Sequence, residues 1–200
     1  MAVSSLMVPL GTPAPDFALP PADGGELVSL GDFADAPALL VAFLCNHCPY
    51  VRHVESAFGQ VTGEYAPRGL ATIGISCNDV RSYPDDAPEH MVEQARRAGF
   101  GFPYLYDEDQ AIARAYRAAC TPDLFLYDAG RRLAYRGEFD GTRPSGGVPA
   151  TGESLIAALD LVLAGRPVPE PHRPSAGCSI KWRPGNDPGP ATALGDLRLV

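Results

Sequence analysis

The feature that most constrains the fold is a pair of cysteines between an apolar run and an amphipathic run. Residues 38–44 (Ala-Leu-Leu-Val-Ala-Phe-Leu) carry no polar side chain, so they predict a strand that is buried on both faces of a sheet. Apolar residues from Val51 to Tyr65 recur at helical spacing and predict a helix. Cys45 and Cys48 therefore lie where a buried strand ends and a helix begins.

This position favours cysteine chemistry. The first N–H groups of a helix lack partners within the helix, and the helix dipole adds partial positive charge there. That field favours the thiolate, which is the reactive form of cysteine. The spacing of Cys45 and Cys48 allows a disulfide across one helical turn, and His47 between them is expected to stabilise the reduced thiolate further. Pro49 suits the first helical turn, where its missing N–H costs little.

The same spacing also allows other interpretations. A Cys-x-x-Cys pair is half of a zinc site, but such a site usually needs a second close pair. Cys77, Cys120 and Cys178 are dispersed along the chain and do not supply one. A strand–Cys-x-x-Cys–helix arrangement is more typical of redox proteins than of metal sites. The sequence therefore favours a redox pair, with a metal site and inert structural cysteines as alternatives.

Four segments resemble the thioredoxin-like superfamily, and within it the peroxiredoxin-like (redoxin, AhpC/TSA-type) proteins. The motif at residues 45–48 is similar to the Cys-x-His-Cys form of the more oxidising members. Residues 14–19 (Ala-Pro-Asp-Phe-Ala-Leu) resemble the entry segment of redoxins. Pro122, at the head of a predicted strand, resembles the cis-proline that faces the cysteine pair in this superfamily. Residues 177–182 (Gly-Cys-Ser-Ile-Lys-Trp) resemble a C-terminal signature of the peroxiredoxin-like subgroup.

The resemblance implies an α/β fold of the thioredoxin-like type. We expect a central mixed sheet flanked by helices, with an N-terminal extension and a strand–helix insertion at about residues 100–119. The implied domain covers residues 8–165. Seven prolines and few apolar runs predict an irregular tail over residues 166–200, partly docked around residues 177–182. A length of 200 residues suits one domain with an extension.

The function implied by the resemblance is thiol–disulfide exchange. Cys45, expected to be the more exposed thiol, would attack a substrate disulfide, and Cys48 would resolve the mixed disulfide. His47 and the helix terminus would tune the redox potential. Thr121 and Pro122, joined by a cis bond, would present a free backbone edge that positions an extended thiol substrate.

Three further cysteines lie outside the motif. Cys120 and Cys178 are candidate accessory thiols, although a buried anchor is an alternative for Cys178. Cys77 ends a predicted buried strand and is expected to be a small core residue.

Peroxide reduction is the second candidate function. In peroxiredoxins the attacking cysteine belongs to a Thr-x-x-Cys pattern at the same junction, so Cys48 would take its position and Cys45 would replace the threonine. The arginine that activates the thiolate in that family aligns with Pro122. Arg52 or Arg114 would have to replace it in space.

A metal-binding module is the third candidate, because thiolates and imidazole suit Zn²⁺ or Cu(I). His47 lies inside the ring that Cys45 and Cys48 would form, so these three groups do not converge easily on one ion. By resemblance, the chain needs neither a metal nor an organic cofactor.

Charge and composition limit the expected partners. A formal net charge of −8 argues against nucleic acid and anionic membrane surfaces. No apolar run approaches the ~20 residues of a membrane span, and the first ten residues do not resemble a secretory signal. We therefore expect a cytoplasmic protein, in which an oxidisable pair is catalytic rather than structural. The expected partners are a thiol or disulfide protein or small-molecule substrate, and a thioredoxin- or glutathione-type electron donor.

Overall fold

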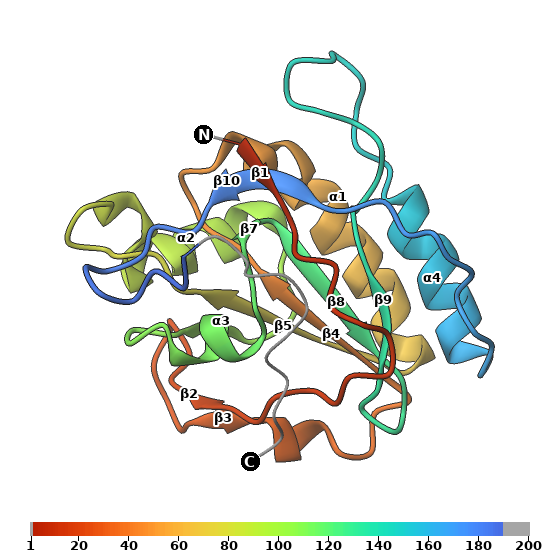
Figure 1. The fold of residues 1–200 in the computed structure, drawn as a ribbon. Helices are drawn as coiled ribbons and strands as arrows, with labels where there is room; N and C mark the ends of the chain where they lie inside the picture. The colour runs from red at the N-terminus through yellow and green to blue at the C-terminus, as the bar shows by residue number, and fades with distance from the viewer. Residues whose placement is uncertain (1, 190–200) are drawn as a thin grey trace.

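A five-stranded mixed sheet forms the centre of the computed structural model, which describes residues 2–189 (Figure 1). Its strands run in the order β6-β5-β4-β8-β9. Strand β4 pairs in parallel with β5, and β5 with β6, whereas β8 is antiparallel to both β4 and β9. The strands are β4 (Ala38–Phe43), β5 (Leu70–Ser76), β6 (Tyr104–Tyr106), β8 (Asp123–Tyr127) and β9 (Leu133–Arg136). The predicted central mixed sheet is confirmed.

Helices cover both faces of this sheet. Side chains of α1, α2 and α4 pack in the apolar cluster on one face, and those of α3 and the N-terminal segment pack in the cluster on the other. Figure 1 shows α1 and α4 side by side. None of the helices in this part of the chain is long and apolar enough to span a bilayer. The helices are α1 (Pro49–Tyr65), α2 (Pro88–Ala98), α3 (Ala111–Ala115), α4 (Glu153–Leu163) and the 3-10 helices η1 (Leu30–Phe33), η2 (Ala66–Arg68) and η3 (Pro84–Asp86).

The unbroken apolar sequence of β4 follows from its central position. Leu40 and Ala42 point into the cluster beneath α1 and α4, while Leu39, Val41 and Phe43 point into the opposite cluster. All six residues of the strand are fully buried. Strand β4 is therefore a rigid support that delivers the following loop to one edge of the sheet.

A smaller sheet joins three distant parts of the chain. Its order is β1-β10-β7, and both pairings are antiparallel. A separate ribbon pairs β2 with β3. The strands are β1 (Ala2–Ser4), β10 (Ala176–Ser179), β7 (Cys120–Thr121), β2 (Ala18–Leu19) and β3 (Val28–Ser29).

The predicted irregular tail over residues 166–200 therefore contains a strand. Strand β10 docks between the N-terminal strand and the segment that precedes β8. Residues 190–200 of the predicted tail lie outside the described part of the chain.

Helices α1 and α2 approach each other at Gly59. A Cβ atom at this position would collide with the carbonyl oxygen of Ala98, the last residue of α2. We expect Gly59→Ala to lower the free energy of unfolding by about 2 to 3 kcal/mol, because the backbones of the two helices must separate.

The matched control is Gly63→Ala in the same helix, where an added Cβ meets no heavy atom within 4 Å. Alanine there should raise stability by up to about 1 kcal/mol through helix propensity. Denaturant unfolding followed by circular dichroism measures both changes. Similar effects at the two positions would contradict the close approach at Gly59.

Candidate active site

The loop between β4 and α1 presents two thiols at the start of the helix. Cys48 immediately precedes the first turn of α1, with an extended backbone (φ −70°, ψ 123°), and Pro49 is the first helical residue. Cys45 and Cys48 both expose 0% of their surface. The expectation that Cys45 is the more exposed thiol is therefore wrong.

The Thr121–Pro122 segment lies against both sulfurs, and its peptide bond is cis, as predicted. Cys45 Sγ lies 3.1 Å from Thr121 Oγ1. The Cys48 thiol donates to the carbonyl oxygen of Thr121 at 3.1 Å. The structure thus brings together four of the residues singled out in the sequence.

Strand β10 occupies the backbone edge beside Thr121. Cys178 pairs with Thr121, and Ser179 pairs with Cys120. A Cβ atom added to Gly177 would overlap the Thr121 carbonyl oxygen, so the two segments touch through their backbones. The expectation of a free edge for an extended substrate is wrong, because the chain's own C-terminal segment fills that place. Cys178 also packs against the apolar cluster that contains the motif cysteines, which contributes to their burial.

The surroundings of Cys48 stabilise its thiolate. A hydrogen bond from the Cys45 thiol lowers the pKa of Cys48 most strongly, and burial opposes this effect. The thiol and the N–H of Cys178 and the N–H of Val51 also donate to the sulfur, and the pKa falls to about 5. The Thr121 carbonyl can accept only from the protonated thiol, so this contact opposes ionisation.

Cys45 has the opposite tendency. Burial raises the pKa of the Cys45 thiol well above its ordinary value, and its hydrogen bond to Cys48 and the negative charge of Asp86 add to this. The lowered pKa of Cys48 and the raised pKa of Cys45 therefore favour the thiolate on Cys48, at the start of α1. This is the reverse of the roles expected from the thioredoxin-like resemblance.

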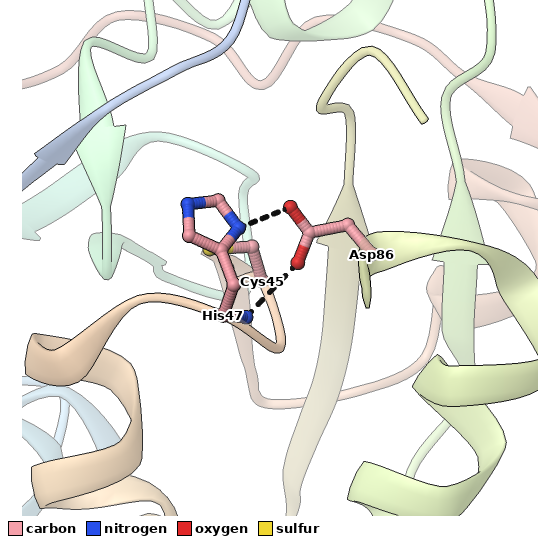
Figure 2. A group of neighbouring side chains, drawn as sticks. All are labelled: Cys45, His47 and Asp86. Carbon is pink, nitrogen blue, oxygen red and sulfur yellow. Dashed lines mark hydrogen bonds and ion pairs between the residues drawn. The ribbon is translucent and has the colours of Figure 1, made fainter. Parts of the chain in front are cut away.

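A buried carboxylate that the sequence analysis did not single out holds His47 (Figure 2). Asp86 Oδ2 lies 2.6 Å from His47 Nδ1, and Asp86 Oδ1 accepts from the His47 backbone N–H at 3.0 Å. The backbone N–H of Asn46 donates to Oδ1 at 2.8 Å, and Asn78 Nδ2 donates to Oδ2 at 2.8 Å. Asp86 is 0% exposed, so this carboxylate fixes both middle residues of the motif.

The contact between His47 and Asp86 shifts both groups toward their charged forms. The hydrogen bond that His47 donates to Asp86 raises the pKa of His47. Burial alone would raise the pKa of Asp86, but hydrogen bonds from His47 and Asn78 lower it below its ordinary value. The His47 ring also stacks on Tyr83, with 5.3 Å between centroids, and Lys181 Nζ lies 5.4 Å from the Tyr83 ring centre.

The sequence holds a partial signal for Asp86. It follows β5, the parallel neighbour of β4, and the carboxyl ends of parallel strands meet at one edge of a sheet. Asp79, Asp85 and Asp86 all follow that strand, however, and nothing local distinguishes the one that binds His47.

A second network ties α2 to the motif backbone. Gln94 Nε2 donates to the Cys45 carbonyl oxygen at 3.2 Å and to Glu55 at 3.1 Å. Arg97 pairs with Glu55 at 2.8 Å and donates to the side chain of Asn46 at 3.0 Å. The close approach of α1 and α2 thus also fixes the backbone around Cys45.

Cys45, His47 and Asp86 place one ligand-type atom each within 4.8 Å of one another. A metal ion held by His47 Nδ1 and Asp86 would replace the hydrogen bond between these two side chains. Three ligands would also fall short of the four of a closed zinc site. The geometry fits a hydrogen-bonded network better than a metal centre.

The remaining cysteines differ in their distance from the motif. Cys178 contacts the Cys48 sulfur directly, and Cys120 is buried and donates to the Pro122 carbonyl oxygen at 3.4 Å. Cys77 ends β5 and packs in the cluster on the opposite face of the sheet. The structure therefore brings both candidate accessory thiols to the site and leaves Cys77 in the core.

Neither arginine considered as a peroxiredoxin-type clamp contacts the sulfurs. Arg52 Nε donates to the Asn46 carbonyl oxygen at 2.8 Å. Arg114 is exposed on α3, which covers the other face of the sheet. Within residues 2–189, the hydrogen-bond partners of Cys45 and Cys48 include no arginine.

The fold and the site define a thioredoxin-like protein, with a cis-proline facing a Cys-x-x-Cys pair at a helix start. Residues 10–136 match the AhpC/TSA family, and the chain belongs to that family.

Two solved structures share the fold over nearly the whole chain. A hypothetical protein of Sinorhizobium meliloti 1021 is 48% identical, with a TM-score of 0.88 over 91% of this chain and 99% of that one. An uncharacterized conserved protein of Geobacillus kaustophilus is 49% identical, with a TM-score of 0.88 over 92% and 97%.

Two less similar proteins carry names from different branches of thiol chemistry. The curated 1-Cys peroxiredoxin B of Oryza sativa subsp. indica is 31% identical over 107 residues, 52% of this chain and 47% of that protein. This chain thus matches about half the length of that relative. A thiol:disulfide interchange protein of Chlorobium tepidum TLS shares the fold at 20% identity, with a TM-score of 0.59 over 76% of this chain and 97% of that one.

Proposed function

We propose that this chain catalyses thiol–disulfide exchange, with Cys48 as the attacking thiolate and Cys45 as the resolving thiol. The observation that carries the proposal is the position of Cys48, which directly precedes the first turn of α1, has its sulfur against Thr121 and lies beside a second thiol at Cys-x-x-Cys spacing. A thiolate is the nucleophile of disulfide exchange, and a neighbouring thiol resolves the product.

The exchange takes place in two displacements. The Cys48 thiolate attacks one sulfur of a substrate disulfide, forms a mixed disulfide and expels the other substrate sulfur as a thiolate. The Cys45 sulfur then attacks Cys48 Sγ, closes the Cys45–Cys48 disulfide and releases the second substrate thiolate. The proton of the Cys45 thiol ends on a departing substrate thiolate, so the substrate gains two electrons and the pair loses two.

The charges around the motif favour an oxidising pair. A low thiolate pKa stabilises the reduced protein relative to the disulfide, which raises the redox potential. His47, paired with Asp86, adds positive charge beside the sulfurs when protonated. The proposed partners are therefore a thiol or disulfide substrate and a thioredoxin- or glutathione-type donor.

Peroxide reduction is the second candidate, favoured by the thiolate on Cys48 and by the likeness to 1-Cys peroxiredoxin B. In that reaction Cys48 would attack a peroxide oxygen, becoming a sulfenic acid and releasing water or an alcohol. The absence of an arginine among the partners of the two motif sulfurs in residues 2–189 speaks against it.

Equilibration of the full chain in glutathione redox buffers tests the proposal. Alkylation followed by mass spectrometry should reveal a reversible Cys45–Cys48 disulfide, with a potential between about −270 and −120 mV. A parallel sample receives hydrogen peroxide. The exchange proposal is wrong if no Cys45–Cys48 disulfide forms with glutathione and peroxide instead rapidly yields a Cys48 sulfenic acid. Peroxide reduction would then be the proposed function.

A further inference from the structure

The cysteine pair is closed off from solvent by a strand that carries its own thiol. Cys45 and Cys48 expose none of their surface, whereas Cys178 in β10 is only partly buried. An external thiol or disulfide therefore meets Cys178 more readily than it meets either motif cysteine.

The register of β10 places Cys178 beside the residue that contacts both motif sulfurs. Its residue pair across the small sheet is Thr121, whose carbonyl and hydroxyl oxygens contact Cys48 and Cys45. Cys178 packs against the apolar cluster that contains Cys45 and Cys48, and its hydrogen bonding lowers the pKa of Cys48. Gly177 allows this contact, because a side chain there would collide with the Thr121 carbonyl oxygen.

We propose that Cys178 is a third redox thiol, which relays the disulfide between the buried Cys45–Cys48 pair and an external thiol. The proposal rests on the exchange chemistry proposed above. It assigns to Cys178 the place that a substrate sulfur takes in that chemistry, beside Thr121 and in contact with Cys48.

The relay runs in three displacements. The Cys178 sulfur attacks Cys48 Sγ of the Cys45–Cys48 disulfide, so a Cys48–Cys178 bond forms and Cys45 leaves, taking up the proton that Cys178 gives up. An external thiol then attacks Cys178 Sγ, and Cys48 leaves as the thiolate. A second external thiol releases Cys178 and forms the external disulfide. Two external thiols are oxidised and the Cys45–Cys48 pair is reduced.

The charges suit a thiol that is activated only when the pair is oxidised. Burial, the hydrogen bond given to Cys48 and the charge of the Cys48 thiolate raise the pKa of Cys178 to about 11, while Lys181 lowers it. When Cys48 is in a disulfide it carries no charge and needs no donor. The two contributions from Cys48 then vanish, and Cys178 ionises more easily.

Mapping of disulfides in Cys45→Ser tests the relay. The full-length variant, reduced and then treated with oxidised glutathione, should form a Cys48–Cys178 disulfide, after a transient glutathione adduct on one of these two thiols. Alkylation and mass spectrometry identify the linked peptides. A glutathione adduct on Cys48 that persists with Cys178 still reduced would overturn the relay.

The rate of reduction provides a second measurement. Reduction of the wild-type Cys45–Cys48 disulfide by glutathione should slow by about tenfold or more in Cys178→Ser, because the intramolecular thiol has a high effective concentration. Cys77→Ala is the matched control, since Cys77 packs on the opposite face, and its rate should equal that of wild type. Equal rates in Cys178→Ser and wild type would contradict the relay. If the wild-type protein forms a Cys45–Cys48 disulfide, the exchange proposal holds whatever the rate in Cys178→Ser. If that disulfide does not form, both the exchange proposal and the relay are wrong.

Discussion

Replacement of Cys48 by serine is expected to abolish thiol–disulfide exchange, whereas Cys45→Ser combined with Cys178→Ser should retain the first displacement and accumulate mixed disulfides on Cys48. The reason is that the hydrogen bonds that stabilise a thiolate converge on Cys48, while burial holds Cys45 in its thiol form. The loss in Cys48→Ser should be at least about 1,000-fold, as for removal of other attacking nucleophiles. Trapping with a disulfide substrate, followed by mass spectrometry, separates the two variants.

The ionisation of Cys48 gives an independent measurement. Thiolate absorbance at 240 nm in the reduced protein should fall as the pH drops through about 5, the pKa that its donors give Cys48. Cys45→Ala removes the strongest of these donors and should raise the pKa, whereas Cys45→Ser retains a hydroxyl donor and should raise it less. If Cys45→Ser abolishes the first step and Cys48→Ser traps mixed disulfides, the order of attack expected from the thioredoxin-like motif is correct instead.

The elements that hold the motif could be predicted from the sequence, because local composition determines them. The apolar runs that form β4 and β5 admit only a strand buried on both faces, and the structure buries them so. The helix predicted after Cys48 begins at Pro49 and ends at Tyr65. A proline and a glycine follow it closely and prevent its continuation.

Other element boundaries depend on distant residues or on unusual backbone. The helix of the strand–helix insertion expected at about residues 100–119 ends at Ala115, because Arg117 adopts a left-handed backbone (φ 56°) without a glycine to signal it. Thr151, just before α4, is of a residue type that commonly caps the start of a helix. Asp140 instead accepts from the backbone N–H groups of Thr151 and Gly152, and its position eleven residues upstream of Thr151 hides this role in the sequence.

In the candidate site, too, some features could be predicted from the sequence and others could not. The sequence identifies Cys45, Cys48 and Pro122, since a motif or a resemblance marks each of them. The low pKa of Cys48 comes first from Cys45 in the same motif, and further from Cys178, which β10 brings beside Thr121 from a distant part of the chain. Such contacts leave no local pattern in the sequence. The expectation that Cys45 attacks therefore rests on the family motif alone.

Removal of the charge of Asp86 is expected to have the second large effect. In Asp86→Asn a carboxylate that accepts four hydrogen bonds becomes an amide with one accepting oxygen, so donors from Asn46, His47 and Asn78 compete for it. Leaving buried donors unsatisfied should lower the free energy of unfolding by about 2 to 3 kcal/mol. Asp85→Asn is the matched control, because the Asp85 residue is exposed, and it should change stability little.

The pH dependence distinguishes the ion pair from simple packing. The pKa of His47 is raised above 6.5 in the folded protein, so its stabilising contribution is present below pH 6.5 and lost as the pH rises through the folded value. The pKa of Asp86 is lowered below 3.8, so its contribution is present above pH 3.8 and lost as the pH falls through the folded value. The stability difference between wild type and Asp86→Asn should therefore be largest between pH 3.8 and 6.5 and shrink on either side. NMR titration should show the His47 pKa falling in the variant, and a loss of stability that is independent of pH would contradict the paired charges.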